Sequence, residues 1–357
     1  MVNPEYFFRL SLNAAFGLAC LISLLTVALL LSKRLRQAWA AYSEKREAFY
    51  LPLILQAVTR EAGAIPQSVF GAGRRIGDWR IVENSLFKWS KSMSGFGLEG
   101  LYLIFQQEGF ADYEIRRLQS PRWWVRAQAA RRLGQMLCVK AIPSLIRTLR
   151  DPSLEVRLVA VRALGHMGEI RAVEEIVRAL ATHSRLAALS LTNVIQELGV
   201  RAVPVLRELL QRPDLQVQVL AIRLLSHMKD KAAGSLIAPF LSSEHLEARI
   251  AACQALAEIG DIAAAPSIAR VLRDPAWEAK AKAAWALGKL RSVENMPRLV
   301  ACLEDQAWWV RFNAGEALAS LGGEGKAALE GCLAHPDRFS RDMAAQWLDE
   351  LSSGRVR

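Results

Sequence analysis

Apolar and polar residues follow a helical period along most of the chain, and the pattern repeats. Counting from Val156, positions 0, 4, 7, 8 and 11 are apolar, which places them on one face of an amphipathic helix. The same frame starts at Val125, Ala279 and Val310, so that Val125 and Val156, like Ala279 and Val310, are 31 residues apart. A fixed period of this size is typical of a solenoid, in which each repeat packs against its neighbours.

Each repeat is predicted to hold two helices. The first helix has a proline in its opening turn, where proline is tolerated, and these prolines are Pro143, Pro204, Pro266 and Pro297. The second helix is the repeated frame itself, predicted to start near Val125, Val156, Ala187, Val217, Ala248, Ala279 and Val310. We expect N-caps at Asp151, Asp274 and Asp305. Left-handed C-caps are expected at Gly165, Gly168, Gly260 and Gly288. A closing helix with a buried Trp347 is predicted over residues 343–351.

An uncharged, mostly apolar stretch runs from Leu10 to Ser32 near the N-terminus. As a helix its 23 residues would span ~34 Å, enough to cross a bilayer. A cleaved signal peptide is the alternative, but its apolar region is usually only ~7–15 residues long and ends at a small-residue cleavage site, which is missing here. The basic residues after the stretch predict a single-pass anchor with the repeats in the cytoplasm: Lys33, Arg34, Arg36, Lys45 and Arg46.

The segment between this stretch and the repeats is predicted to be helical with one break. Residues 33–59 continue the helical pattern as a basic neck, which either contacts anionic lipid headgroups or only sets the orientation. Glycines and Pro66 predict a loop over residues 62–78, and its Gly71–Gly77 part lacks the spacing of a phosphate-binding loop. Helices are expected over residues 79–93, 98–107 and 111–118, the last as a cap. The chain is therefore divided into residues 1–32, 33–119 and 120–357.

The net charge of +11 is concentrated near the N-terminal end of the repeats. Residues 120–150 carry seven basic and no acidic side chains, whereas residues 151–357 carry 25 of each. A nucleic-acid-binding solenoid would be basic along its length, so this distribution argues against one. The five cysteines are scattered without a CxxC pair, which indicates reduced cysteines rather than a disulfide framework.

The pattern D-P-x-x-x-V-R-x-x-A-x-x-A-L-G over residues ~120–350 resembles HEAT repeats, in particular the bacterial PBS lyase HEAT-like type. The resemblance implies an all-α, armadillo-like fold: a right-handed α-solenoid of about seven helix pairs preceded by one transmembrane helix. It also implies that the second helices line the concave face. In the family, the Asp and the basic residue six positions later form a ladder between units, here Asp151, Arg157, Asp274, Lys280, Asp305 and Arg311. Ala188 and Gln218 replace the basic residue, which predicts an interruption in the middle.

Enzymes of related shape carry motifs that this chain lacks. The di-iron hydroxylases use His-Glu pairs, and none of the five histidines here is followed by Glu. Iron–sulfur relatives need clustered cysteines, which are missing. We therefore expect no enzyme activity, no cofactor and no metal. A catalytic or cofactor-handling subunit of the bilin-lyase type stays an alternative, as does a nucleic-acid-binding HEAT-like protein.

Positions 6 and 10 of the second helices face away from the packing positions. The side chains expected there to meet a partner are Arg131, Arg162, His166, Arg223, His227, Trp285 and Glu316. They are either ordinary solvated residues or a groove for an acidic or amphipathic protein segment. Tryptophans just before the second helices, such as Trp277 and Trp308, are expected to pack in turns rather than to bind.

These features predict a protein-interaction scaffold or adaptor in a bacterial inner membrane. Residues 10–32 would hold it in the membrane, and its repeats would present a concave surface in the cytoplasm. The expected partner is a protein, such as a membrane enzyme complex, and no nucleic acid is expected.

Overall fold

The structure is a computed structural model that describes residues 4–59, 76–90, 101–102, 104–105, 109–181, 194–195 and 197–353. The chain forms two compact units, Met1–Tyr113 and Glu114–Arg357. All regular elements among the described residues are helices, and none of these residues lies in a strand. The predicted all-α class is therefore confirmed.

The first unit is built on one long helix, α1, which runs from Pro4 to Thr59 without interruption. It joins the apolar stretch to the basic neck, as the continuous helical pattern predicted. Helix α3 (Ile76–Ser90) packs against α1, and Lys88 Nζ lies 3.3 Å from Glu47 Oε1 across that contact. Tyr50 of α1 is buried.

The predicted loop over residues 62–78 is too long at its C-terminal end. Helix α3 already begins at Ile76, so Gly77 lies inside a helix. The rest of this loop falls outside the described residues, and so does most of the helix expected over residues 98–107. The predicted capping helix is present as α5 (Phe110–Arg117).

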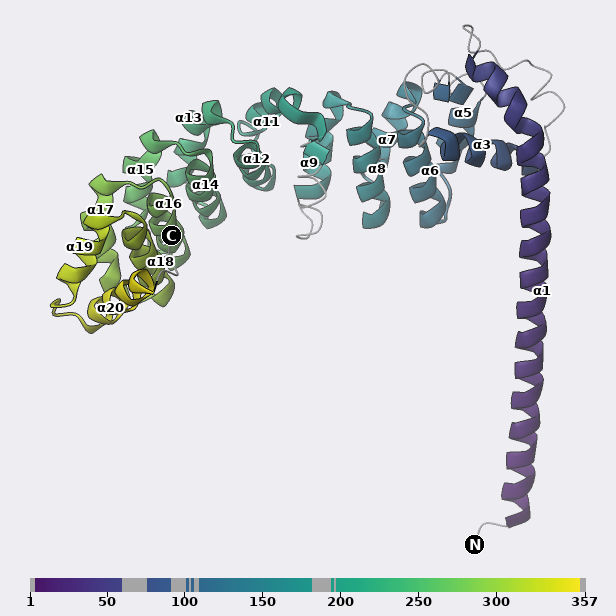
Figure 1. Cartoon of the computed structure of the whole chain (residues 1–357), viewed down its shortest axis with the longest axis horizontal. Helices are drawn as coiled ribbons and strands as arrows, with labels where there is room; N and C mark the ends of the chain where they lie inside the picture. Colours follow the sequence, from purple (N-terminus) through teal and green to yellow (C-terminus); the bar gives the residue numbers. More distant parts are fainter. Residues whose placement is uncertain are drawn as a thin grey trace. The chain divides into compact units, whose positions relative to one another are not determined.

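The second unit alternates first and second helices along an arc (Figure 1). The first helices are α7 (Ile142–Thr148), α9 (Val173–Ala181), α11 (Val203–Leu209), α13 (Gly234–Ile237), α15 (Ala265–Val271), α17 (Met296–Ala301) and α19 (Gly323–Cys332). The second helices are α6 (Trp123–Gln135), α8 (Leu154–His166), α12 (Leu215–His227), α14 (Leu246–Ile259), α16 (Trp277–Lys289), α18 (Trp308–Ser320) and α20 (Arg338–Ser352). The second helix expected near Ala187 falls in residues 182–193, outside the described part.

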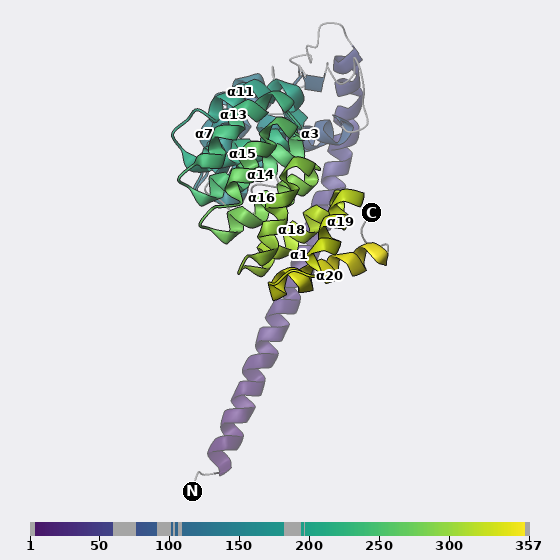
Figure 2. The same cartoon turned by 90° about the vertical axis from the view of Figure 1, so that its left-hand side faces the viewer.

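Short 3-10 turns lead into or extend the first helices. They are η1 (Val139–Ala141), η2 (Ile170–Ala172), η3 (Gly199–Ala202), η4 (Lys231–Ala233), η5 (Ala238–Ser242), η6 (Ile262–Ala264), η7 (Val293–Asn295) and η8 (Cys302–Glu304). Each predicted proline lies in the first turn of its helix, for example Pro143 in α7 and Pro266 in α15. The first helices form the outer layer of the arc and the second helices the inner layer, as Figure 2 shows for α13 and α15 against α14 and α16.

Consecutive second helices pack against each other through glycine. A Cβ on Gly134 would lie 2.6 Å from Ala163 Cβ, and one on Gly288 would lie 2.6 Å from Ala317 Cα. Gly165 meets Val194 in the same way. The prediction that Gly165 and Gly288 are left-handed caps is therefore wrong, because both lie inside helices where only glycine lets the next helix come this close.

The other predicted caps have mixed outcomes. Gly260 ends α14 in the left-handed conformation with φ 80°, as predicted. The three aspartates are not N-caps, since the N-cap positions of α8, α16 and α18 are occupied by Ser153, Ala276 and Ala307. Instead, each aspartate accepts the backbone N–H two residues ahead, at 2.9 Å from Asp151 Oδ1 to Ser153 N. The carboxylate therefore shapes the turn before the helix.

The closing helix is part of a complete helix pair. Helix α20 packs against both α18 and α19, and Trp347 is buried with its ring 5.1 Å from that of Phe312. A Cβ on Gly315 would lie 2.2 Å from the Trp347 ring, so glycine makes room for this indole. The burial of Trp347 confirms the prediction.

We expect Gly288→Ala to lower the free energy of unfolding by ~1–3 kcal/mol, because the new methyl group collides with the Ala317 backbone of α18. Gly331→Ala is the matched control, since Gly331 lies in α19 with nothing within 4 Å of a Cβ. There alanine should stabilise the helix by up to ~1 kcal/mol. Denaturant unfolding of both variants measures this difference, and equal stabilisation by the two changes would contradict the close contact.

Candidate functional site

The candidate site is the row of side chains at positions 6 and 10 on the inner face of the second unit. In α8, the packing residues Val156, Ala160 and Leu164 are buried, while Arg162 and His166 on the opposite side are exposed. The same arrangement exposes further members of the row, namely Arg131, Arg223 and His227. The structure therefore places the predicted basic residues of repeats one, two and four in solvent.

These arginines differ in how far their charges are balanced. Arg223 Nη2 lies 3.1 Å from Glu247 Oε1, with both side chains about half exposed. Arg162 donates from Nε to the Leu158 carbonyl at 3.4 Å. Within the described part of the chain, neither Arg131 nor Arg162 has a carboxylate partner. The first two repeats therefore offer the strongest uncompensated positive charge on the inner face.

The row ends in a hollow of about 390 Å³ between α16 and α18. It is lined by Trp285, Lys289 and Glu316. Trp285 and Glu316, the two residues predicted for the C-terminal half of the row, therefore lie together. Lys282 Nζ lies 4.6 Å above the centre of the Trp285 ring. The hollow thus offers an aromatic surface beside charges of both signs.

Sequence reasoning missed a hydrogen-bonded cluster between the two halves of the row. Ser226 Oγ donates to Glu258 Oε2 at 2.6 Å, and Gln254 Nε2 donates to Glu258 Oε1 at 2.8 Å. Position 10 of α14 is therefore occupied by a carboxylate with structural partners, and it is less available to a ligand than the arginines.

The ladder links a basic residue of one repeat to the aspartate of the next. Arg126 binds Asp151 through two hydrogen bonds, Nε to Oδ2 at 2.7 Å and Nη2 to Oδ1 at 2.8 Å. Arg249 binds Asp274 in the same two-pronged way at 2.6 and 2.9 Å. Lys280 pairs with Asp305. These ion pairs are mostly shielded from solvent, so each joins two repeats firmly.

The six-residue spacing has a different origin from the one expected. Arg157 Nη1 donates to the Asp151 backbone carbonyl at 2.5 Å, and Arg311 Nη1 donates to the Asp305 carbonyl at 2.7 Å. The basic residue therefore ties down its own turn, and in Arg126 and Arg249 it also reaches across to the aspartate of the following repeat. It does not pair through its side chain with the carboxylate six residues before it.

The predicted interruption is present around Gln218. Its Nε2 donates to the Arg212 carbonyl at 2.7 Å, which preserves the contact six residues back. The next repeat has Ser243 where an aspartate would be needed, so the ladder has no ion pair at this step. The position of Ala188 lies outside the described residues. At the other end, Arg311 lies 4.4 Å from the centre of the Phe339 ring instead of against an aspartate.

A buried carboxylate closes the N-terminal end of the second unit. Glu114 is fully buried, and Arg117 Nη1 donates to its two oxygens at 2.7 and 2.9 Å. Arg132 Nη1 adds a third hydrogen bond at 3.2 Å. No pattern in the sequence had singled out this group.

The tryptophans predicted to precede the second helices lie in their first turns instead and are about half exposed. Trp124 exposes 55% and Trp309 53% of their surface. Trp308 stacks on Phe312 with ring centres 4.8 Å apart. These rings contact neighbouring side chains, yet they keep a wide apolar surface in solvent.

The sequence matches the profile of HEAT repeats over residues 115–193, 203–276 and 265–349, more than half of the chain. The chain belongs to the HEAT-repeat family. No protein among those with curated functions matches it.

Solved structures of HEAT-like shape resemble this chain at low identity. A mutant of Kap121p is 11% identical with a TM-score of 0.55, over 84% of this chain and 41% of Kap121p. An engineered protein is 22% identical with a TM-score of 0.41, over 87% of this chain and 96% of its own. The complex of CpcE and CpcF of phycocyanin lyase from Nostoc sp. is 22% identical, with a TM-score of 0.29 over 68% and 94% of the two chains. At this identity the likeness to Kap121p supports the solenoid fold alone.

The HEAT-repeat ladder lowers the pKa of the Asp151 carboxylate. Burial by itself would raise the pKa of Asp151, but hydrogen bonds from Arg126 and Ser153 and the charges of Arg126 and Arg157 hold this pKa below its ordinary 3.8. A carboxylate whose pKa is lowered by folding adds stability above its unfolded value, and this stability is lost as the pH falls through the folded value. The Asp151 ion pair is therefore intact at neutral pH and fails only in acid.

Burial dominates the ionisation of two cysteines of the repeats. It raises the pKa of Cys253 and of Cys302 to about 12, so both thiols stay protonated at neutral pH. A protonated thiol is a poor nucleophile. Within the described residues, no three His, Cys, Asp or Glu side chains lie close enough together to hold a metal ion.

We expect Arg249→Ala to lower the free energy of unfolding by ~1.5–3 kcal/mol, because it removes charged hydrogen bonds shielded from water. Arg223→Ala is the matched control, since it breaks only the exposed pair with Glu247 and should cost under ~1 kcal/mol. Thermal and denaturant unfolding of both variants give the comparison. Equal losses would mean that the ladder pair adds nothing beyond an ordinary surface pair.

Proposed function

We propose that this HEAT-repeat protein is a membrane-anchored, non-catalytic scaffold whose inner face holds a protein partner. The observation that carries the proposal is the row of side chains at positions 6 and 10, in which the basic members are exposed and Trp285 and Glu316 are partly exposed. The packing positions beside it are filled by buried alanine, valine and leucine, as in α8. The repeat core therefore needs none of the residues in this row, and they are free to contact another molecule.

The chemistry of the row suits an acidic or amphipathic segment. Arg131 and Arg162 can each bind a carboxylate through two hydrogen bonds, a geometry that guanidinium groups favour. Farther along, the Trp285 hollow can take an apolar or cationic side chain. A segment with acidic residues at one end and an apolar anchor at the other would match both halves.

The membrane anchor is supported by helix α1. The span Phe16–Pro52 is long and apolar enough to cross a bilayer, and none of its most apolar window is buried within the protein. Phe16 exposes 73% and Leu24 67% of their surface. A bilayer would cover these side chains, whereas water would leave a large apolar surface exposed. We propose a single pass through a bacterial inner membrane with the repeats in the cytoplasm, beside a membrane enzyme complex.

Topology is tested with a reporter fused after Arg357 and with protease added to spheroplasts. The basic residues after the span, such as Lys33, Arg34 and Arg36, should keep the repeats in the cytoplasm and protect them from the protease. Changing these three residues to Glu should reduce the fraction of molecules whose repeats lie in the cytoplasm. Cleavage of the wild-type repeats from outside the spheroplast would overturn the proposed topology.

The inner face is tested by the triple change Arg131→Glu, Arg162→Glu and Arg223→Glu, with pull-down from detergent-solubilised membranes. Arg131→Glu and Arg162→Glu should each be tolerated within ~0.5 kcal/mol. Arg223→Glu also breaks the exposed pair with Glu247 and should cost about 1 kcal/mol, while an acidic partner is repelled by all three changes. The control reverses three exposed basic residues outside the second helices, Lys231, Arg298 and Lys326. Partners retained by the control and lost by the triple variant support the proposal. Retention of every partner by the triple variant would exclude the basic half of the row.

A further inference from the structure

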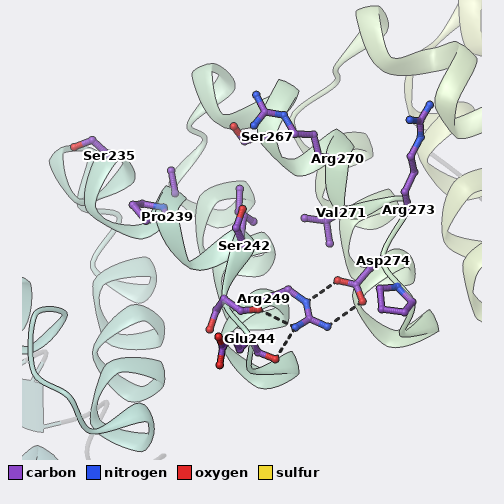
Figure 3. A pocket seen from close by; sticks show the side chains of 14 residues that line it. Ser235, Pro239, Ser242, Glu244, Arg249, Ser267, Arg270, Val271, Arg273 and Asp274 are labelled. Atoms are coloured by element: carbon purple, nitrogen blue, oxygen red, sulfur yellow. Dashed lines mark hydrogen bonds and ion pairs between the residues drawn. The ribbon is translucent and has the colours of Figure 1, made fainter.

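The second unit carries a groove on its outer layer, separate from the inner-face row. It has a volume of about 740 Å³ and lies between α13–η5 and α15, beside the turn into α16 (Figure 3). Its walls include Ser235, Pro239, Ser267, Arg270 and Arg273. Residues from two successive first helices therefore face one another across an open space.

The charges around this groove are unequally balanced. Arg249 and Asp274 neutralise each other through the ladder pair at one end. The two other arginines, Arg270 and Arg273, are exposed, and the structure gives neither of them an ion pair within the described residues. Glu244 lies at the opposite end of the groove from Arg270 (Figure 3). Arg270 lies beside Ser267 at one end of the groove, and Arg273 adds a second available guanidinium group at its rim (Figure 3).

The same groove occurs a second time, near the N-terminal end of the unit. A hollow of about 310 Å³ is lined by Ser144, Arg147, Arg150 and Asp151. Arg147 Nη2 donates to Ser144 Oγ at 3.1 Å, and Arg150 makes an exposed pair with Glu175 at 3.1 Å.

The two grooves share one sequence, Pro-Ser-x-x-Arg-x-Leu-Arg-Asp-Pro, which starts at Pro143 and again at Pro266. Both aspartates in it are held by the ladder arginine of the preceding repeat. The matched side chains of the first and the second groove are Ser144 and Ser267, Arg147 and Arg270, Arg150 and Arg273, and Asp151 and Asp274.

Packing does not require these arginines. In the repeat that follows the larger groove, Ala301 stands at the position of Arg270 and Glu304 at that of Arg273. With those residues α17 still packs against α18. The two arginines thus serve neither the core nor the ladder.

We propose that both outer grooves bind acidic side chains of an extended protein segment. Each guanidinium can grip one carboxylate, and the serine hydroxyls can donate to further oxygens. Apolar atoms of Pro239, Leu241 and Val271 line the larger groove as well, which suits a peptide backbone and side chains better than a small free anion. This surface goes beyond the proposed inner-face function, because it lies on the other helix layer and uses other residues.

The test uses the full chain in nanodiscs of zwitterionic lipid and a fluorescently labelled octaglutamate peptide, with binding followed by anisotropy. Arg270→Glu with Arg273→Glu should weaken binding at least ~tenfold, and adding Arg147→Glu and Arg150→Glu should weaken it further, because like charges repel the peptide. The control Arg298→Glu with Lys326→Glu makes the same change in net charge outside the grooves and should alter binding less than ~twofold.

The inner-face triple variant separates this inference from the proposed function. It should retain binding to the grooves. Loss of binding in the triple variant together with full binding in the four-arginine variant would assign the peptide to the inner face and overturn the groove proposal. An equal loss in the charge-matched control would also overturn it, because general attraction to a basic protein would then explain the binding.

Two further arms distinguish other ligands and guard against misfolding. Displacement of the peptide by inorganic phosphate at the same concentration of anionic groups, or preferential binding of vesicles containing anionic lipid, would overturn the choice of a protein segment. If the Glu variants lose helicity or melt early, Arg270→Gln with Arg273→Gln removes the charge without reversing it. If this double variant folds, and if it and the matching double variant Arg147→Gln with Arg150→Gln both bind the peptide with wild-type affinity, the grooves are ruled out as its binding site.

Discussion

The close approach of consecutive second helices is the contact on which the repeat unit depends. Gly134 and Gly288 stand at position 9 of the repeated frame that counts Val125 and Ala279 as position 0, and there even a methyl group would collide with the next helix. Small residues such as Ser226 and Ala257 take this position in other repeats. Because one side of each second helix is pressed against its neighbours, positions 6 and 10 are left facing solvent. The same constraint that builds the solenoid thus creates its inner face.

The ladder adds a second constraint at the turns. The ion pairs of Arg126 and Arg249 tie each turn to the following repeat, while the hydrogen bonds from these arginines to backbone carbonyls fix the turn itself. Gln218 still fixes its own turn, because its amide donates to a backbone carbonyl. It forms no ion pair with the following repeat, because its amide is uncharged and that repeat has no aspartate at this position. At Gln218 the ladder therefore lacks its ion pair, and other contacts join these repeats, such as the pair of Arg207 and Asp230.

Much of the fold could be read from the sequence because a repeat displays its periodicity many times. Helix starts, prolines, the buried Trp347 and the interruption at Gln218 were all predictable in this way. The pattern could not give the distance between helices, so Gly165 and Gly288 were mistaken for caps. Nor could it reveal that Asp151 accepts from the turn rather than from the helix end. The outer grooves escaped notice because each of them needs side chains from successive repeats, which periodicity treats one at a time.

In a solenoid, packing demands nearly the same residue at each core position of every repeat. A position whose residue varies between repeats is therefore one that packing does not constrain. Arginine at Arg162 and tryptophan at Trp285 occupy one position, and Arg270 and Ala301 occupy another. The core thus does not fix these residues of the inner and the outer surface, and their side chains can differ from repeat to repeat along the arc. Exposed arginine–carboxylate contacts are individually weak. If α1 holds the repeats at the membrane that carries the partner, the raised effective concentration compensates for that weakness, and several such contacts would suffice for a lasting complex.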